Sequence, residues 1–379
     1  MKKNVFKKIV ATVMAAATTL AACFALTSCG DKTFEKNSFK IGGTGPLTGD
    51  NASYGISVQN GAKLAVKHLN EKGDVKFSYA MLDDQCDPVA AGANYDTLID
   101  AGMQMSLSGV TSGAAEAFAT KANVDKLFSM SPSASADPVI NNKDYSFRLC
   151  FGDPDQGQLA AQTIKAGIDA GTYATVGVIY DNSDSYSEGL YQAFADEMEA
   201  LGVQYVEAKF DKDNKTEFGT QVSALKDCDI VFMPFYYTEA SLFIKQAVAA
   251  GSDAVFFGSD GFDGIAELIP GVTNKVMYIT PFDVKSTEQA VVNFVAAYEA
   301  EYGVKPDQFA ADAYDVVMAM AKALEIAGVT DYNMSAEEMS AVLISTMTSS
   351  SFSYDGLTGD GMKWTKDGKC VKAAKIVEL

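Results

Sequence analysis

Two hydroxyl-rich loops in the first half of the chain have the composition of an anion-binding site. Thr111-Ser112-Gly113 follows an apolar strand that ends at Val110 and directly precedes a helical pattern. Hydroxyls and free backbone N–H groups at a helix N-terminus suit a carboxylate. The segment Ser131-Pro132-Ser133-Ala134-Ser135 follows the next strand and adds further hydroxyls and backbone carbonyls. Ser and Thr are also ordinary capping and turn residues, so neither loop is decisive alone.

Tyrosines and one carboxylate stand at strand ends in the second half. Tyr180-Asp181, Tyr236-Tyr237 and Ser259-Asp260-Gly261 each follow an apolar strand, and Tyr186 is close to the first of them. Aromatic walls with one carboxylate suit a small cation such as an ammonium group. The simpler alternative is that these are core tyrosines and a turn aspartate. Together with the hydroxyl-rich loops, they describe a pocket for an α-amino acid, with a carboxylate site, an ammonium site and apolar walls.

Residues needed for common enzyme chemistries are missing. His68 is the only histidine, which argues against a Ser-His-Asp triad and a histidine zinc site. There is no GxxxxGKS/T phosphate loop, and Pro46 breaks the dinucleotide-binding pattern that Gly42-Gly43-Thr44-Gly45 begins. The aspartates within 83–87 lack the spacing of an EF-hand loop. We therefore expect no enzymatic activity, no metal and no cofactor.

Apolar β patterns alternate with amphipathic helical patterns, which is typical of α/β architecture with mostly parallel sheets. The first unit has expected strands at 39–43, 75–82, 105–110 and 127–130 and expected helices at 55–71, 88–101 and 114–122. The second unit has expected strands at 175–180, 204–210, 230–234, 255–258 and 275–280 and expected helices at 157–170, 187–201, 218–225 and 240–250. Three further helices are expected at 287–302, 310–327 and 336–347.

These elements predict two Rossmann-like lobes joined by a hinge. The late helices need a sheet to cover, and the first lobe is the natural host, so the chain must cross between lobes more than once. A hinge between two α/β lobes creates a cleft. The expected division is lobe 1 at 39–152, lobe 2 at 153–281, lobe 1 again at 282–355, and a C-terminal segment at 356–379 that returns toward the hinge and lobe 2.

The N-terminus has the features of an export signal with a lipid-attachment site. A lysine-rich start precedes a mostly apolar run at 9–26, which is short for a permanent membrane span. Leu26-Thr27-Ser28-Cys29 then fits a bacterial lipoprotein box. We expect residues 1–28 to be the signal peptide, Cys29 to carry the lipid, and residues 29–38 to form a flexible stalk. Cys23 is the alternative lipidation site, and an ordinary secretory signal is a third interpretation.

The acidic composition narrows the choice of partners. A formal net charge of -19 repels phosphate, so no nucleic-acid partner is expected.

The remaining cysteines do not form a recognisable motif. Cys86, Cys150, Cys228 and Cys370 are scattered and lack metal-site spacing. One or two disulfides and buried free thiols are both compatible with this pattern.

Six short stretches in order carry a resemblance to a known family. They are IGGTGPLTG at 41–49, DDQCDP at 83–88, SPSAS at 131–135, YSEG at 186–189, QAVAAG at 246–251 and GSDG at 258–261. Over nearly its whole mature length the chain resembles the leucine/isoleucine/valine-binding proteins of branched-chain amino acid ABC importers, which have the type I periplasmic-binding-protein fold. The resemblance implies a monomeric, extracytoplasmic protein that closes on a small aliphatic amino acid and delivers it to permease subunits.

The resemblance also implies the ligand contacts. The hydroxyl that receives the ligand carboxylate falls on Ser112, and Asp260 stands where the family often has a glutamate for the ammonium group. Cys86 matches one cysteine of a family disulfide, but Thr111 occupies the position of its usual partner, so that bridge is not expected. The full set of implied ligand-binding residues is Tyr54, Ser112, Ser133, Ala134, Ser135, Tyr186, Tyr236, Asp260 and Phe309.

Two alternatives stay open from the sequence. One is a binding protein for another small molecule, such as an amide, a short peptide or an aromatic acid. The other is a sensory lipoprotein that signals to a membrane receptor.

Overall fold

The computed structural model describes residues 34–379. The expected signal peptide at 1–28 and both candidate lipidation cysteines, Cys29 and Cys23, lie outside the described residues. Within the described residues, none of the helices combines the length and the apolar character needed to cross a bilayer.

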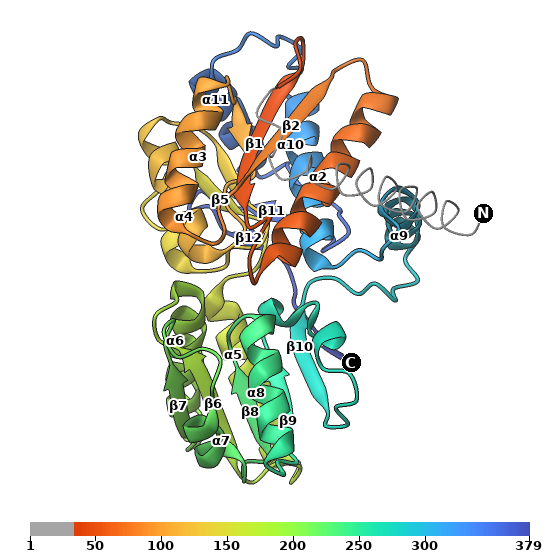
Figure 1. The fold of residues 1–379 in the computed structure, drawn as a ribbon. Helices are drawn as coiled ribbons and strands as arrows, with labels where there is room; N and C mark the ends of the chain where they lie inside the picture. Colours follow the sequence, from red (N-terminus) through yellow and green to blue (C-terminus); the bar gives the residue numbers. More distant parts are fainter. Residues whose placement is uncertain (1–33) are drawn as a thin grey trace, which may run out of the picture.

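The first lobe is built on a five-stranded parallel sheet with the order β2-β1-β3-β4-β5 (Figure 1). Its strands are β1 (Phe39–Gly45), β2 (Phe77–Asp83), β3 (Met105–Ser106), β4 (Ser129–Ser131) and β5 (Ser146–Arg148). The helices around it are α2 (Ala52–Lys72), α3 (Pro88–Asp100), α4 (Ser112–Val124), α9 (Gln289–Tyr302), α10 (Gln308–Ile326) and α11 (Ala336–Met347). The late helices α9, α10 and α11 complete this lobe.

The second lobe is built on a six-stranded sheet with the order β13-β10-β9-β8-β6-β7, in which only β13 is antiparallel. Its strands are β6 (Val176–Asp181), β7 (Val206–Phe210), β8 (Ile230–Met233), β9 (Val255–Gly258), β10 (Val276–Thr280) and β13 (Lys375–Glu378). Its helices are α5 (Asp153–Asp169), α6 (Ser185–Ala200), α7 (Gly219–Leu225) and α8 (Tyr237–Ala249). The fold class predicted from the sequence is confirmed.

Strand β8 shows why this sheet is covered on both faces. Ile230 and Phe232 pack with residues of α5 and α6, whereas Val231 and Met233 pack with residues of α7 and α8. Successive side chains of a strand point to opposite faces, so an uninterrupted apolar strand needs helices on both sides.

Close helix packing in the first lobe depends on one glycine. A Cβ atom at Gly61 in α2 would lie 2.1 Å from the backbone oxygen of Ala310 in α10. Only glycine permits this approach, so α10 is pressed against α2 at the level where Tyr54 and Phe309 stack.

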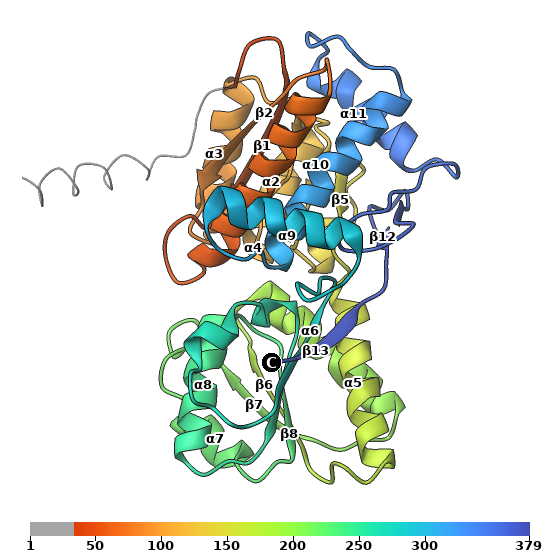
Figure 2. The same cartoon turned by 90° about the vertical axis from the view of Figure 1, so that its right-hand side faces the viewer.

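Three connections join the lobes, at 149–152, 281–288 and 372–374 (Figure 2). The third runs from the small β11–β12 ribbon, made of Lys363–Trp364 and Cys370–Val371, to β13 at the edge of the second sheet. The sequence analysis did not predict β5, β11, β12 or β13.

A buried ion pair fixes the third connection to the first lobe. The Lys372 Nζ lies 3.1 Å from Asp312 of α10, and these two side chains are 0% and 2% exposed. The same Nζ donates a 2.9 Å hydrogen bond to the Thr358 hydroxyl. The end of the chain is therefore attached to both lobes.

The expected flexible stalk does not extend to Ser38. The Ser38 side chain is buried, and its hydroxyl donates a 2.9 Å hydrogen bond to the Glu35 carbonyl and lies 2.8 Å from the Ser78 hydroxyl, with which it shares a second hydrogen bond. Phe34 packs against the apolar residues around Tyr95. The chain from Phe34 onward therefore belongs to the first lobe, because Phe34 and Ser38 both pack against it.

Candidate ligand-binding site

A small cavity between the two lobes brings most of the predicted site residues together. Its lining consists of Tyr54, Val110, Thr111, Ser112, Ser133, Tyr186, Tyr236, Asp260, Gly261 and Phe309. The space that a water-sized sphere can reach inside is about 10 Å³, roughly the room of one water molecule. The structure is therefore a closed arrangement, in which the lobes meet around the site.

The first lobe contributes hydroxyls at the N-terminus of α4. Ser112 is the first residue of this helix, and its Oγ accepts a 3.3 Å hydrogen bond from the Ala136 backbone N–H. Ser133 donates a 2.8 Å hydrogen bond to the Val110 carbonyl. The Thr111 hydroxyl is buried and has no hydrogen-bond partner among the described residues. These groups, at the positive end of a helix dipole, can bind an anion.

The second lobe contributes one carboxylate held by a tyrosine. Asp260 is 5% exposed and accepts a 2.7 Å hydrogen bond from the Tyr186 hydroxyl. That hydroxyl in turn accepts a 2.8 Å hydrogen bond from the Gly261 N–H. The Tyr186 ring stacks on Tyr236 at a centroid distance of 4.9 Å and an angle of 7°. The carboxylate is thus fixed beside a flat aromatic wall, as a site for a small cation requires.

Tyr54 ties the two lobes together across the cavity. It lies in α2 of the first lobe, and its hydroxyl donates a 2.5 Å hydrogen bond to the Gly261 carbonyl of the second lobe. The hydroxyl also accepts a 3.2 Å hydrogen bond from the Tyr237 N–H. Its ring stacks on Phe309 with centroids 4.2 Å apart. Because both contacts to the second lobe form only when the lobes meet, Tyr54 favours closure.

Burial controls the protonation of the carboxylates in this region. Desolvation raises the pKa of Asp260 to about 6, although hydrogen bonds from Tyr186 and its surroundings lower it. Asp153, at the start of α5, is 2% exposed, and burial raises its pKa well above the usual range. Neither carboxylate oxygen of Asp153 has a hydrogen-bond partner in the part of the chain that the structure describes. Asp260 is therefore the carboxylate that can ionise near neutral pH at the cavity wall.

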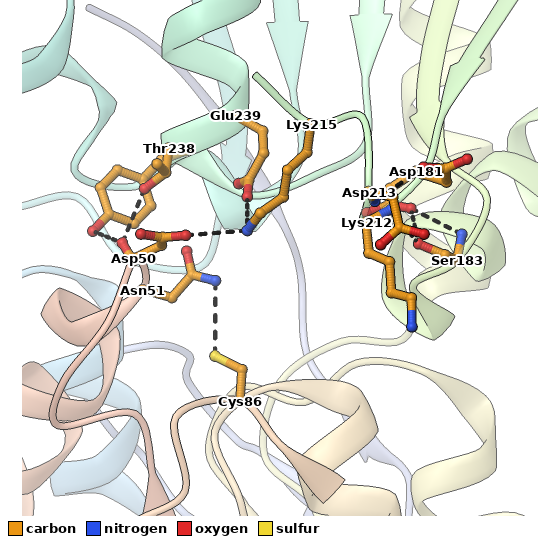
Figure 3. Close-up of polar contacts among 12 residues, drawn as sticks. Asp50, Asn51, Cys86, Asp181, Ser183, Lys212, Asp213, Lys215, Thr238 and Glu239 are labelled. Atoms are coloured by element: carbon orange, nitrogen blue, oxygen red, sulfur yellow. Dashed lines mark hydrogen bonds and ion pairs between the residues drawn. The ribbon is translucent and has the colours of Figure 1, made fainter. Parts of the chain in front are cut away.

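A second set of contacts joins the lobes at the mouth of the cleft (Figure 3). The Lys215 ammonium of the second lobe lies 3.1 Å from Asp50 of the first lobe and 2.9 Å from Glu239 of its own lobe. The Asp50 carbonyl accepts hydrogen bonds from the Thr238 and Tyr237 hydroxyls, 3.0 and 3.1 Å long. Lys215 therefore bridges the lobes when they are closed.

Seven of the nine predicted ligand-binding residues line the cavity, and two do not. Those two, Ala134 and Ser135, are buried outside its lining. The Ser135 carbonyl accepts a hydrogen bond from the Arg148 guanidinium and a 3.0 Å hydrogen bond from the Asp153 N–H. Because both donors belong to the region of the first connection between the lobes, this carbonyl is turned toward the hinge.

Three lining residues were not predicted as ligand contacts, namely Val110, Thr111 and Gly261. Thr111 could have been found, because it carries a hydroxyl and stands next to Ser112. Val110 and Gly261 bring no chemical group that would single them out in a sequence. Gln156, whose side-chain oxygen accepts a 3.0 Å hydrogen bond from the Asp260 N–H, was also missed.

The cysteines of the described residues are all free thiols. Cys150, Cys228 and Cys370 are buried and Cys86 is half-buried. Of the alternatives left open by the sequence, the structure shows free thiols. Cys86 is among these free thiols, and the residue at the position of its usual partner in the family is Thr111.

Two α/β lobes, three connections and a cavity lined from both sides define a bilobal ligand-binding protein. Residues 38–379 match the periplasmic binding protein family, and the chain belongs to this family. Among curated relatives, the leucine-, isoleucine-, valine-, threonine- and alanine-binding protein of Pseudomonas aeruginosa is 28% identical over 343 residues, covering 87% of this chain and 89% of that protein.

Solved structures share the fold. The branched-chain amino acid transporter substrate-binding protein LivJ of Streptococcus pneumoniae, in complex with isoleucine, has a TM-score of 0.78 and 25% identity, covering 90% of this chain and 100% of that one. A solute-binding protein from R. palustris in complex with benzoate has a TM-score of 0.79 and 21% identity, covering 90% and 93%. The second similarity shows the fold alone.

Proposed function

We propose that this protein is the extracytoplasmic solute-binding component of an ABC importer and binds a small aliphatic amino acid without chemically changing it. One observation carries the proposal: Ser112 and Ser133 of one lobe and Asp260 of the other line the same interlobe cavity. A hydroxyl-rich helix N-terminus facing a buried carboxylate matches the two charges of an α-amino acid. The amino acid-binding relatives support the same assignment.

The proposed mechanism follows from which lobe holds each group. In the open form, Ser112 and Ser133 take the ligand carboxylate at the start of α4. Closure then brings Asp260 and its tyrosines to the ammonium group. Water is excluded, so the attraction between the ammonium and the carboxylate is strengthened. The permease subunits then select the closed form.

The proposed location and assembly rest on the sequence. Cys29 would carry the lipid that holds the protein on the outer face of the cell membrane, with the segment before Phe34 as the tether. The protein would act as a monomer that docks on the permease. The two lobes would move as bodies about the connections at 149–152, 281–288 and 372–374.

Two measurements test this function. Mass spectrometry of small molecules released from the purified, denatured protein should detect an amino acid. Isothermal titration calorimetry with the twenty common amino acids should give binding heat with at least one. No released amino acid and no heat from any of the twenty would refute the proposal.

We expect affinity for the amino acid to fall as the pH is lowered through about 6. The ammonium group requires an ionised Asp260, whose pKa burial raises to about 6. Above this pH the carboxylate is ionised and the affinity should be constant. Well below it, each pH unit should weaken binding by up to about tenfold, because binding must release a proton. Calorimetry between pH 5 and 8 measures the profile.

The control for this profile is Asp153→Asn. Asp153 lies near Asp260 and is also buried, but it does not line the cavity. The variant should therefore keep the pH dependence. An affinity that stays flat from pH 5 to 8 in the unmodified protein would exclude Asp260 as the ammonium partner.

Replacing Lys215 with alanine should weaken ligand binding about two- to fivefold through faster dissociation, because an exposed ion pair contributes up to about 1 kcal/mol. Lys215 pairs with Asp50 of the other lobe only in the closed form, and the Asp50 side chain of that pair is 62% exposed. Stopped-flow dissociation measures the effect. Lys212→Ala is the matched control, because Lys212 lines the same mouth but forms no ion pair within the described residues. Equal dissociation rates for the two variants would contradict a role for Lys215 in closure.

An aromatic acid is the second candidate ligand. The cavity is lined by four aromatic side chains, and one protein of the same fold binds benzoate. Benzoate carries no ammonium group, however, and would leave the buried Asp260 carboxylate without a cation. Titration with benzoate, together with the amino acids, decides between the two classes.

A further inference from the structure

A second cavity lies at the mouth of the cleft, next to the small site between the lobes. Its volume is about 220 Å³. Asn51 and Cys86 reach it from the first lobe, whereas Lys215 and Glu239 reach it from the second (Figure 3). We call this space the outer chamber.

The outer chamber adjoins the amino-acid site through Tyr236, which lines both. A ligand anchored in the small site would therefore have to pass the Tyr236 ring to reach the outer chamber.

Three buried polar atoms around the outer chamber lack a hydrogen-bond partner. They are Asn51 Oδ1, Glu239 Oε2 and the Tyr236 hydroxyl oxygen, none of which has a partner among residues 34–379. Asn51 is 9% exposed and Glu239 is 7% exposed. Buried polar groups are nearly always paired, so three such atoms around one space are unusual. Two of them can only accept hydrogen bonds, and the third can accept as well as donate.

The partners of these residues leave the accepting atoms free. The Asn51 amide nitrogen points to the Cys86 sulfur at 3.7 Å, so its oxygen is the unused end. The Lys215 ammonium donates a 2.9 Å hydrogen bond to Oε1 of Glu239, which leaves Oε2 unused. The chamber is also lined by two further acids, Asp181 and Asp184. Together with Glu239 they make three acidic residues against two lysines in the lining, so an anionic ligand group is disfavoured in the chamber.

We propose that the outer chamber is a second subsite, which receives a hydrogen-bond-donating distal group of the bound amino acid, such as a carboxamide or an ammonium. This rests on the amino-acid site of the proposed function, which anchors the other end, but it replaces the aliphatic side chain given there with a side chain that ends in a polar group. An aliphatic end would leave Asn51, Glu239 and Tyr236 unpaired in a closed cleft. A site built to pair with a donor rejects the analogue that lacks it.

The test compares ligands of similar length that differ only at the distal end. Glutamine offers a donor, glutamate offers an anion of nearly the same shape, norleucine offers neither, and lysine offers an ammonium. Calorimetry should show glutamine or lysine binding at least tenfold more tightly than both norleucine and glutamate. The quantity to compare is the ratio of the affinities for two ligands. A change that affects lobe closure in general alters both affinities equally and leaves their ratio unchanged.

Two variants and a control sharpen the test. Asn51→Ala removes an acceptor and should lower the ratio of glutamine to norleucine affinity severalfold. Glu239→Gln places an amide donor in the chamber and should shift preference from glutamine toward glutamate. Asp213→Ala is the control, because Asp213 is exposed near the same mouth but does not line the chamber.

The outcomes separate the two proposals. If leucine or norleucine binds as tightly as glutamine and lysine, and neither variant changes the ratios, the outer chamber is not a subsite but the proposed function stands. If no amino acid binds, both proposals fall. A reversal of the glutamine and glutamate preference in Glu239→Gln would directly support the subsite, because a purely structural change would not invert it.

Discussion

Replacing Asp260 with alanine should weaken amino-acid binding by roughly 30-fold to several thousandfold. Removing one partner of a buried, hydrogen-bonded charge pair costs about 2–5 kcal/mol, and each 1.4 kcal/mol is about a tenfold change in affinity. Asp260 is 5% exposed and is the only carboxylate among the residues that line the described cavity. The ligand ammonium would therefore be left without a counter-ion in a closed site. Titration calorimetry with the amino acid identified from the protein measures the loss.

Folding and binding can be separated in this experiment. Burial raises the pKa of Asp260 to about 6, so at pH 7 its ionised form is destabilising in the ligand-free protein. The penalty grows as the pH rises above the unfolded pKa and is absent well below it. Asp260→Asn should consequently keep or raise the melting temperature at pH 7 while losing affinity. A loss of affinity accompanied by unfolding would not support a binding role.

Asp331→Ala provides the surface control. Asp331 is exposed, and its carboxylate accepts hydrogen bonds from the backbone and side chain of Asn333, in a turn of the first lobe. This variant should bind like the unmodified protein. Equal affinities for the Asp260 and Asp331 variants would remove Asp260 from the site.

Each α-helix of the described residues was expected from the sequence, although several of them, including α5, α6 and α8, begin two to four residues earlier than predicted. Asp184 precedes α6 and accepts a 3.1 Å hydrogen bond from the Ser187 N–H, and Ser335 forms a capping box with Glu338 before α11. Such caps act within a few residues, so they are visible in one sequence. The alternating pattern of strands and helices then determines the fold class.

Short strands could not be predicted because their stability comes from distant partners. Strand β5 has only three residues and ends in Arg148, a residue that a buried strand rarely contains. Its charge is accommodated by the Ser135 carbonyl and by Asp137, whose carboxylate lies 3.1 Å away. Strand β13 forms because β10 presents a free edge almost a hundred residues earlier in the chain. Neither partner can be identified from the strand itself.

The site residues also differ in whether local sequence or distant packing determines their positions. Ser112 and Asp260 lie where parallel strands end, and this rule places them at the edge of each sheet that faces the cleft. Ser135 stands only two residues after Ser133, yet its carbonyl faces the hinge, because Arg148 and the start of α5 both bind it. A sequence identifies the loop that reaches the site, but the direction of each carbonyl depends on the packing around it.

Contacts between the lobes were the hardest features to predict from the sequence. Tyr54 was expected as part of the aromatic shell, but its hydrogen bonds to Gly261 and Tyr237 join residues about 200 positions apart. The Asp50–Lys215 ion pair has a similar separation. These bonds require the two lobes to be closed, so they depend on the hinge as much as on the residues themselves.

Replacing Lys372 with methionine should destabilise the protein by about 3–5 kcal/mol at pH 8, because it leaves Asp312 buried without a partner. The two side chains are 0% and 2% exposed, and their ion pair attaches the last connection between the lobes to α10. Burial raises the pKa of Asp312 to about 7 even with Lys372 beside it. Without the lysine the carboxyl group should take up a proton more readily, so the destabilisation should be smaller at pH 6 than at pH 8. Urea unfolding at the two pH values measures both effects.

The paired variant distinguishes a buried charge from a simple loss of packing. Adding Asp312→Asn to Lys372→Met removes the unpaired charge and should restore most of the stability at pH 8, whereas it should change little at pH 6. If Lys372→Met were as stable as the unmodified protein at pH 8, the ion pair would not hold the C-terminal segment in place. If it were equally unstable at both pH values, lost packing would explain the effect instead. Because β13 continues from this connection into the second sheet, a loosened Lys372 should also weaken ligand binding, since the closed form depends on how all three connections position the lobes.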